Sequence, residues 1–399
     1  MERWVVAAKR ADFAAIGKEF GIDPVIARLI RNRDVQDRDE IRRYLYGKVD
    51  ELASPHLMKD VDKAVQILQN KIKKKKRIRI IGDYDIDGVV STFILIKGLK
   101  RAGALADTYI PDRVADGYGI HEHLIERAVN DGIDVIVTCD NGIAAYNEIT
   151  MAKENGMTVI ITDHHEIPYK ETEDGRELIL PPADAIVNPK QPDCNYPEKR
   201  LCGAVVALKL VTALYEACGI PEKELEDFLE LGAIATVGDV MKLTGENRIL
   251  VKYGLKKMAQ TKNLGLRRLA EKNNLDLGAI TAYHIGFVIG PCLNAGGRLK
   301  TAKEALALLR AQSEEEAERL AEELKELNDT RKDMTEQGTE AAKLQVESWY
   351  QKDKVLVVFL PECHESLAGI IAGRLREYYQ KPAIVLTRGE EAVKGSGRS

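Results

Sequence analysis

Five short apolar runs that alternate with helix-like stretches constrain the fold of this 399-residue chain more than any other feature. They occupy residues 79–82, 108–110, 134–138, 158–162 and 185–187. Stretches of about 10–15 residues with a helical pattern follow the first three runs, which is the spacing of βαβ units with parallel strands. The sequence therefore predicts an α/β fold with a mostly parallel, five-stranded sheet and flanking helices.

The rest of the chain predicts further domains, as its length also requires. A segment rich in Ala, Glu, Leu and Lys indicates one or two long connecting helices, with candidate breaks at Asn328, Asp329 and Gly338. A second, smaller α/β domain is expected to begin after it and to be incomplete at the chain end. The predicted segments are a helical N-terminal lead-in at 1–60, the catalytic domain at 61–300, the connecting helix at 301–353 and the partial C-terminal domain at 354–399.

Composition excludes several classes of protein. No apolar run is long enough for a transmembrane helix, so no membrane association is expected, and the charged N-terminus lacks the apolar core of a secretory signal. Six cysteines without a CxxC pair favour reduced thiols and a cytoplasmic location. The net charge of -4 excludes a globally basic DNA-coating protein, so nucleic-acid binding would need a local basic groove or metal ions.

Acidic and imidazole side chains follow three of the five apolar runs. Residues 82–88 read Gly-Asp-Tyr-Asp-Ile-Asp-Gly, residues 139–142 read Cys-Asp-Asn-Gly, and residues 163–165 read Asp-His-His. Because the carboxyl ends of parallel strands meet at one edge of a sheet, these groups are expected to converge. Asp239, after an apolar helical stretch, is the candidate for a fourth acidic segment.

Such a cluster of carboxylates predicts bound cations, since the charges would otherwise repel one another. Aspartate oxygens with imidazole nitrogens suit manganese and also magnesium, and the absence of cysteine ligands disfavours zinc. A calcium loop is the alternative for residues 82–88, but Ile94 stands where that loop carries its glutamate. Asp-Asn-Gly alone is typical of a turn. The occurrence of all three motifs at strand ends favours a two-metal site for phosphoryl chemistry.

Seven motifs in order resemble the DHH phosphoesterase superfamily and, within it, the RecJ family of bacterial single-strand exonucleases. The resemblance runs from about residue 78 to the end of the chain. Its motifs are GDYDIDG at 82–88, IPDR with GYG at 110–119, CDNG at 139–142, DHH at 163–165, ATVGDV at 235–240, GPCLNAGGR at 290–298 and GSGRS at 395–399.

The resemblance implies a role for each matching residue of the metal site. His165 resembles the histidine that faces the scissile phosphate or helps to hold a metal, and Asp163 the acid that orients the histidine pair. Asp87 is expected to be structural, in the turn before Gly88. The implied metal ligands are Asp83, Asp85, Asp140, His164 and Asp239.

The resemblance also implies a substrate site. Arg113 resembles a residue that meets the DNA phosphate, and Asn294 with Arg298 resembles a phosphate-facing loop. His364 matches a recurring histidine, whereas Ser396 and Arg398 match a glycine-rich loop that seats the 5′ phosphate. The chain departs from the family pattern at Ile81, where many members have histidine, at Gly238, at Cys363, and in ending before an expected OB-fold module.

The implied activity is metal-dependent 5′-to-3′ hydrolysis of single-stranded DNA to mononucleotides, in DNA repair and recombination. It would use two divalent ions, manganese preferred and magnesium as the alternative, and a strand with a 5′ phosphate. A single-strand-binding protein and a helicase are the expected partners of a monomeric enzyme. The alternatives are a phosphodiesterase for very short oligonucleotides or cyclic dinucleotides, and a silent replisome scaffold, which would bind no stoichiometric metal.

Overall fold

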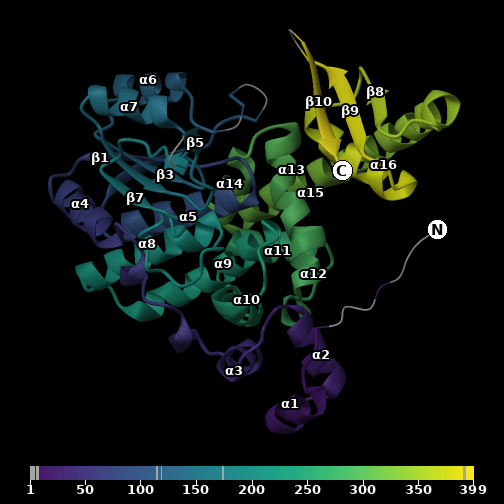
Figure 1. The fold of residues 1–399 in the computed structure, drawn as a ribbon. Coiled ribbons are helices and arrows are strands. Elements are labelled where there is room, and N and C mark those ends of the chain that lie inside the picture. The colour runs from purple at the N-terminus through teal and green to yellow at the C-terminus, as the bar shows by residue number, and fades with distance from the viewer. Residues whose placement is uncertain (1–4, 6–8, 114–115, 118, 173–174, 390–391) are drawn as a thin grey trace. The chain divides into compact units, whose positions relative to one another are not determined.

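The protein is described from a computed structural model that covers residues 1–399, drawn in Figure 1. It describes all residues except 1–4, 6–8, 114–115, 118, 173–174 and 390–391. The chain forms two compact units. Unit 1 consists of Met1–Tyr109, Tyr118–Lys262 and Asp276–Gly286, and unit 2 of Ile110–Gly117, Asn263–Leu275 and Phe287–Ser399.

Unit 1 contains the predicted five-stranded sheet. Its strands are β1 (Arg77–Ile81), β2 (Leu105–Tyr109), β3 (Val135–Cys139), β4 (Thr158–Thr162) and β7 (Ala185–Val187). They lie in the order β2-β1-β3-β4-β7, and every neighbouring pair is parallel. β3 is buried at all five positions, as the continuous apolar pattern of a central parallel strand predicts. The predicted α/β fold class is confirmed.

Helices cover both faces of this sheet (Figure 1). Isoleucine and valine side chains from β1, β3, β4 and β7 pack against α6 and α7 on one face, and α4, α5 and α8 lie on the other. The flanking helices are α4 (Val61–Lys73), α5 (Ile86–Arg101), α6 (Glu122–Asn130), α7 (Tyr146–Glu154), α8 (Gly203–Cys218), α9 (Glu226–Gly238) and α10 (Gly245–Met258).

The N-terminal part of unit 1 is helical, as expected. Buried Ile30, Val35 and Ile41 form its small apolar core. Its elements are α1 (Phe13–Phe20), α2 (Pro24–Asn32), α3 (Arg38–Tyr46), η1 (Val49–Glu51) and η2 (Pro55–Leu57). The short helices later in unit 1 are η3 (Glu222–Leu225), η4 (Leu277–Ala279) and α12 (Ala282–His284), after which the π-helical turn η5 (Ile285–Ile289) follows.

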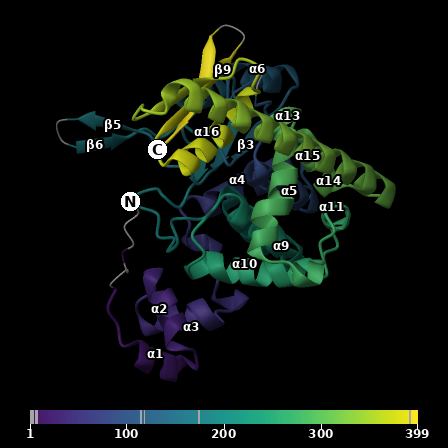
Figure 2. The ribbon, with the colours of Figure 1, turned by 90° about the vertical axis from the view of Figure 1, so that its right-hand side faces the viewer.

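A hairpin of β5 (Tyr169–Thr172) and β6 (Gly175–Leu178) was not predicted (Figure 2). Its described positions are exposed on both strands. Because neither face is buried, the hairpin has no alternation of apolar and polar residues by which sequence could reveal it.

Unit 2 is built on the long predicted helix. α15 (Glu314–Gln345) is one continuous helix (Figure 2), so the expected breaks at Asn328, Asp329 and Gly338 are wrong. Asn328 is buried within the helix and donates a hydrogen bond to Cys292 Sγ. Gly338 provides close approach, since a Cβ there would lie 2.6 Å from Ile371 Cδ1. The other helices of unit 2 are α11 (Leu264–Lys272), α13 (Gly290–Leu299), α14 (Lys303–Arg310), α16 (Glu365–Tyr379) and the π-helical η6 (Val346–Tyr350).

A three-stranded sheet completes unit 2 in the order β10-β9-β8. β8 (Leu356–Phe359) and β9 (Ala383–Arg388) are parallel, β10 (Val393–Arg398) is antiparallel to β9, and α16 packs on the sheet. The second, smaller α/β domain is thus confirmed. The expected loop at residues 395–399 is wrong, because residues 395–398 pair with β9 as a strand. Among the described residues, no helix is long and apolar enough to cross a membrane.

Candidate metal centre

The carboxyl edge of the sheet in unit 1 brings the three predicted motifs together. Ligand atoms of Asp83, Asp85 and Asp140 all lie within 4.8 Å of one another, which is close enough to hold one cation. Two further groups meet the same limit: Asp140 with His164 and His165, and Asp87 with His164 and Asp239. Asp140 and His164 each belong to two groups, so the arrangement has room for two ions that share ligands.

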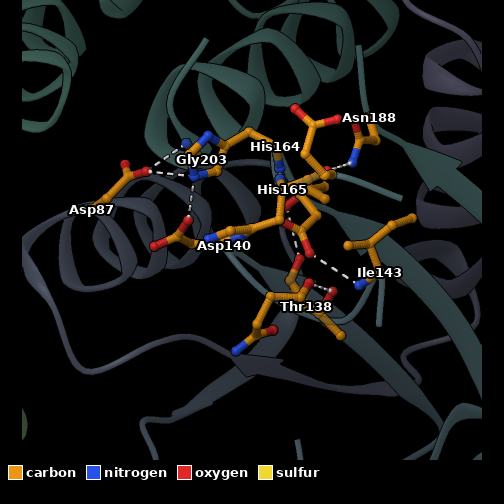
Figure 3. A network of polar contacts seen from close by, with 12 residues as sticks. Asp87, Thr138, Asp140, Ile143, His164, His165, Asn188 and Gly203 are labelled. Carbon is orange, nitrogen blue, oxygen red and sulfur yellow. Dashed lines mark hydrogen bonds and ion pairs between the residues drawn. The ribbon is translucent and has the colours of Figure 1, made fainter. Parts of the chain in front are cut away.

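His164 lies at the centre of the cluster (Figure 3). Its Nε2 is 3.0 Å from Asp140 Oδ1, 3.5 Å from Asp87 Oδ2 and 3.7 Å from Asp239 Oδ2. Apart from this proximity to His164, the buried atoms Asp140 Oδ1 and Asp239 Oδ2 accept no hydrogen bond from any described residue. Buried oxygens of this kind are expensive unless a cation compensates them. The donor set of carboxylate oxygens and imidazole nitrogens therefore fits manganese or magnesium.

The electrostatics of the cluster agree with that fit. Burial raises the pKa of Asp140 well above its usual range, and repulsion from Asp87, Asp85 and Asp83 adds to the effect. Burial, with repulsion from Asp87 and Asp85, raises the pKa of Asp239 to about 7. Burial lowers the pKa of His164, so its ring favours the neutral form that ligates metals. Divalent ions would supply positive charge to offset the carboxylates of the cluster.

Asp163 holds the histidine pair in place. Its Oδ1 accepts hydrogen bonds from His164 N at 2.7 Å, His165 N at 3.0 Å and His165 Nδ1 at 2.8 Å, and its Oδ2 accepts from Ile143 N at 3.0 Å. Burial alone would raise the pKa of Asp163, but the bonds from His165 lower it overall. Asn188 donates to the carbonyl of His165 (Figure 3). The geometry is that of an acid that orients a neighbouring imidazole.

Asp85 and Asp87 each hold a helix N-terminus. Asp85 Oδ1 accepts from the N–H groups of Asp87 and Gly88 and so caps α5. The sequence suggested that Asp87 acts within the turn before Gly88, but its side chain contacts a distant segment instead. Its carboxylate accepts from Gly203 N at 2.6 Å and Ala204 N at 2.8 Å, at the start of α8. Asp85 and Asp87, two acids of the motif at residues 82–88, therefore also fix the starts of α5 and α8 on one face of the sheet.

Two residues that support the cluster were not assigned from sequence. Asn141 Nδ2 donates to the carbonyl of Gly82 and joins the loops after β3 and β1. Gly203 lies against Asp140, because a Cβ there would be 2.8 Å from Asp140 Cβ. Asn141 belongs to a motif that the sequence made visible, whereas nothing local distinguishes Gly203.

Four of the predicted substrate residues gather around the first turn of α16 in unit 2. Arg298 donates to the carbonyl of Ser366 at 3.1 Å, and His364 caps the helix by accepting from Ser366 N. A Cβ at Gly369 would lie 2.9 Å from Ser396 Oγ and 2.7 Å from Arg398 Nη2. Arginines beside a helix N-terminus suit a phosphate.

The two other predicted substrate residues, Asn294 and Arg113, fall elsewhere in unit 2. Asn294 and Arg298 lie on helix α13, so the expected loop at residues 290–298 is wrong. Pro291 lies just after the π-helical turn η5, where helical backbone continues into α13. Arg113 lies in the short segment Ile110–Gly117, of which residues 114–115 are outside the described part.

Comparison with known proteins places these motifs in a family. The model of the DHH family, N-terminal domain, matches residues 77–236. The single-stranded-DNA-specific exonuclease RecJ of Bacillus subtilis (strain 168) is 37% identical over 401 residues, which cover 100% of this chain and 49% of the relative. RecJ of Haemophilus influenzae is 33% identical over 399 residues, covering 96% and 67%. The chain thus spans between about half and two thirds of the length of these curated relatives.

Solved structures agree with the curated relatives. A crystal structure of exonuclease RecJ bound to manganese matches 86% of this chain and 82% of its own, with a TM-score of 0.75 and 34% identity. RecJ from Thermus thermophilus in complex with Mn²⁺ matches 97% and 53%, with a TM-score of 0.79 and 31% identity.

Proposed function

Since this chain belongs to the RecJ family of DHH proteins, we propose that it is a metal-dependent 5′-to-3′ exonuclease that hydrolyses single-stranded DNA to mononucleotides. The observation that carries the proposal is the largely buried cluster of five aspartates and two histidines at the carboxyl edge of the sheet. Its oxygens and nitrogens fit two divalent cations, and manganese and magnesium are the ions named for solved RecJ structures.

Each side chain of the cluster then has a task. Asp83 and Asp85 would hold one ion, Asp239 and His164 the other, and Asp140 would bridge them, in keeping with the groups that its carboxylate joins. When bound, the ions would activate a water molecule and neutralise charge on the phosphoryl group. The hydrogen bond to Asp163 raises the pKa of His165 despite its partial burial and fixes its ring, which would face the scissile phosphate or help to hold a metal.

Unit 2 would supply the recognition of the 5′ end. Arg298 and Arg398, with Ser396 and His364, surround the start of α16, where a terminal phosphate would receive charge-assisted hydrogen bonds. Recognition of a terminal dianion accounts for action from one end, because an internal phosphodiester carries a single charge. Arg113 and Asn294 complete the proposed substrate-binding set.

The proposed setting is DNA repair and recombination in the cytoplasm. The substrate is single-stranded DNA with a 5′ phosphate, and the proposed protein partners of this monomeric enzyme are a single-strand-binding protein and a helicase.

A nuclease assay with manganese tests the proposal. We expect mononucleotides from a long 5′-phosphorylated single strand but not from its duplex, and a loss of about 10²–10⁴-fold in the His165→Ala variant. His56→Ala is the matched control, because His56 pairs with Asp62 and Glu216 on the surface. Turnover of dinucleotides alone would favour the short-substrate phosphodiesterase, and failure to bind metal stoichiometrically would favour the scaffold.

A further inference from the structure

Val240, the residue after Asp239, has a backbone conformation that valine rarely adopts. Its φ is 56°, in the left-handed region. Helix α9 ends here through two hydrogen bonds, from Val240 N to Val237 O at 3.1 Å and from Met241 N to Thr236 O at 3.0 Å. This pair of bonds requires a left-handed residue, and glycine is the usual choice because a Cβ is strained there.

Other helices of unit 1 end with the same pair of bonds and provide an internal comparison. Four of them use glycine at the left-handed position, and α4 uses the unbranched, exposed Lys75. The glycines are Gly103 after α5, Gly132 after α6, Gly156 after α7 and Gly219 after α8. A β-branched residue is the most strained occupant of this position. Termination of the helix therefore does not explain Val240.

Packing does not explain it either. The side chain of Val240 is 86% exposed, so it buries almost no apolar surface. The backbone strain therefore acts against the folded state with no gain from burial to offset it, and glycine at this position would avoid the strain. Strained residues of this kind concentrate where a ligand is bound.

The place of Val240 in the chain indicates the ligand. Asp239 directly precedes it, and Asp239 Oδ2 lies 3.7 Å from His164 Nε2 in the metal centre. Neighbouring Cα atoms are only about 3.8 Å apart, so Val240 is one residue spacing from an acid whose carboxylate reaches the metal centre. An isopropyl group makes no hydrogen bond to a phosphate, but it suits the apolar faces of a deoxyribose and a base.

We propose that Val240 is a substrate-contacting residue, whose rigid isopropyl group packs on the nucleoside attached to the phosphate at the metal centre. This assignment rests on the proposed function. Because the side chain has one favoured rotamer, its contact surface is fixed before the strand arrives.

Three variants test the assignment through stability and kinetics together. Val240→Gly removes both the strain and the side chain, and Val240→Ala keeps most of the strain but shortens the side chain. Lys75→Gly relieves the same backbone strain at the end of α4 and is the matched control. We expect Val240→Gly and Lys75→Gly to raise Tm. Val240→Gly should raise KM for a 5′-phosphorylated single strand by about five-fold, whereas Lys75→Gly should leave KM unchanged. The KM of Val240→Ala should lie between those of Val240→Gly and the wild type. We expect little change in kcat for any of the three variants.

Two results would overturn the assignment alone. An unchanged KM in Val240→Gly, with an active wild type, would show that the side chain does not meet the substrate. A fall in Tm would show that Val240 packs against protein. An inactive wild type would instead refute the proposed function and this assignment with it.

Discussion

The two units hold their charged side chains in opposite ways. In unit 1, aspartates are buried at the ends of parallel strands, and Asp140 is only 2% exposed. In unit 2, arginines surround the start of α16, and Arg398 lies on the edge strand β10, exposed to solvent. We propose that the first arrangement binds divalent cations and that the second binds an anionic phosphate. The comparison can therefore be tested unit by unit, with metal ions for unit 1 and with the terminal phosphate of a strand for unit 2.

The largest expected effect is at Asp140 in unit 1, the acid that we propose bridges the two ions. Asp140→Asn keeps the shape of the side chain but removes its charge, so the manganese-dependent activity should fall by at least about a thousand-fold. Manganese should raise the Tm of the wild type and much less that of the variant. Asp193→Asn, which alters a surface pair with Lys59, is the control. Normal activity in Asp140→Asn would contradict the assignment of this centre.

A second test separates the units. Arg398→Gln should raise KM by about 10–100-fold for a strand with a 5′ phosphate, because a charge-assisted contact is lost. It should have little effect on a 5′-hydroxyl strand and none on the stabilisation by manganese. Arg388→Gln on the neighbouring strand β9 is the matched control. An equal loss on both strands would mean that Arg398 does not read the terminal phosphate.

A third test concerns the space behind Asp140. Gly203→Ala places a methyl group only 2.8 Å from Asp140 Cβ, which is too close for two carbon atoms, so the two segments must separate. We expect a loss of about 1–3 kcal/mol in the free energy of unfolding, together with weaker manganese binding. Gly373→Ala on α16, where a Cβ meets nothing within 4 Å, should gain about 1 kcal/mol. Urea unfolding with and without manganese measures the stability and the manganese binding of both variants. A Gly203→Ala variant as stable as the wild type would show that this position is not crowded by Asp140.

The smallest effect sharpens the comparison within unit 1. Glu230 is a buried carboxylate outside the cluster, and burial raises its pKa to about 7. The unfolded chain releases this proton near its ordinary pKa, so Glu230 makes the protein less stable as the pH rises from about 4.5 to 7. Glu230→Gln should therefore add about 1–2 kcal/mol at pH 8 and little at pH 4.5. Tm measured at both values decides this, and manganese binding should be unchanged.

Burial explains which parts of the molecule the sequence could predict. The strands β1, β3, β4 and β7 of the large sheet are buried along most of their length, so their continuous apolar runs marked them within a few residues. Asp83 and Asp140 closely follow such strands. Because parallel strands end at the same edge of the sheet, the sequence predicted that these acids lie close together, as they do. The β5–β6 hairpin and β10 are exposed and leave no such pattern.

The parts of the site that were missed depend on contacts between distant segments. The link from Asp87 to the start of α8 spans 116 residues, and Gly203 is required only because Asp140 lies against it. The loop expected at residues 290–298 was implied by the family resemblance, but Gly296 lies inside α13 against the backbone of Thr301. A glycine selected for close packing looks, in sequence, the same as a glycine selected for a turn.

The double use of Asp87 has a consequence for how this protein can change. One carboxylate secures the first peptide groups of α8 and also lies 3.5 Å from His164. A substitution that tuned the affinity for metal through this residue would also release the helix, and one that strengthened the helix would shift the charge beside the histidine. Selection for heat resistance and selection for turnover would therefore act on the same atoms here, which leaves this position little mutational freedom.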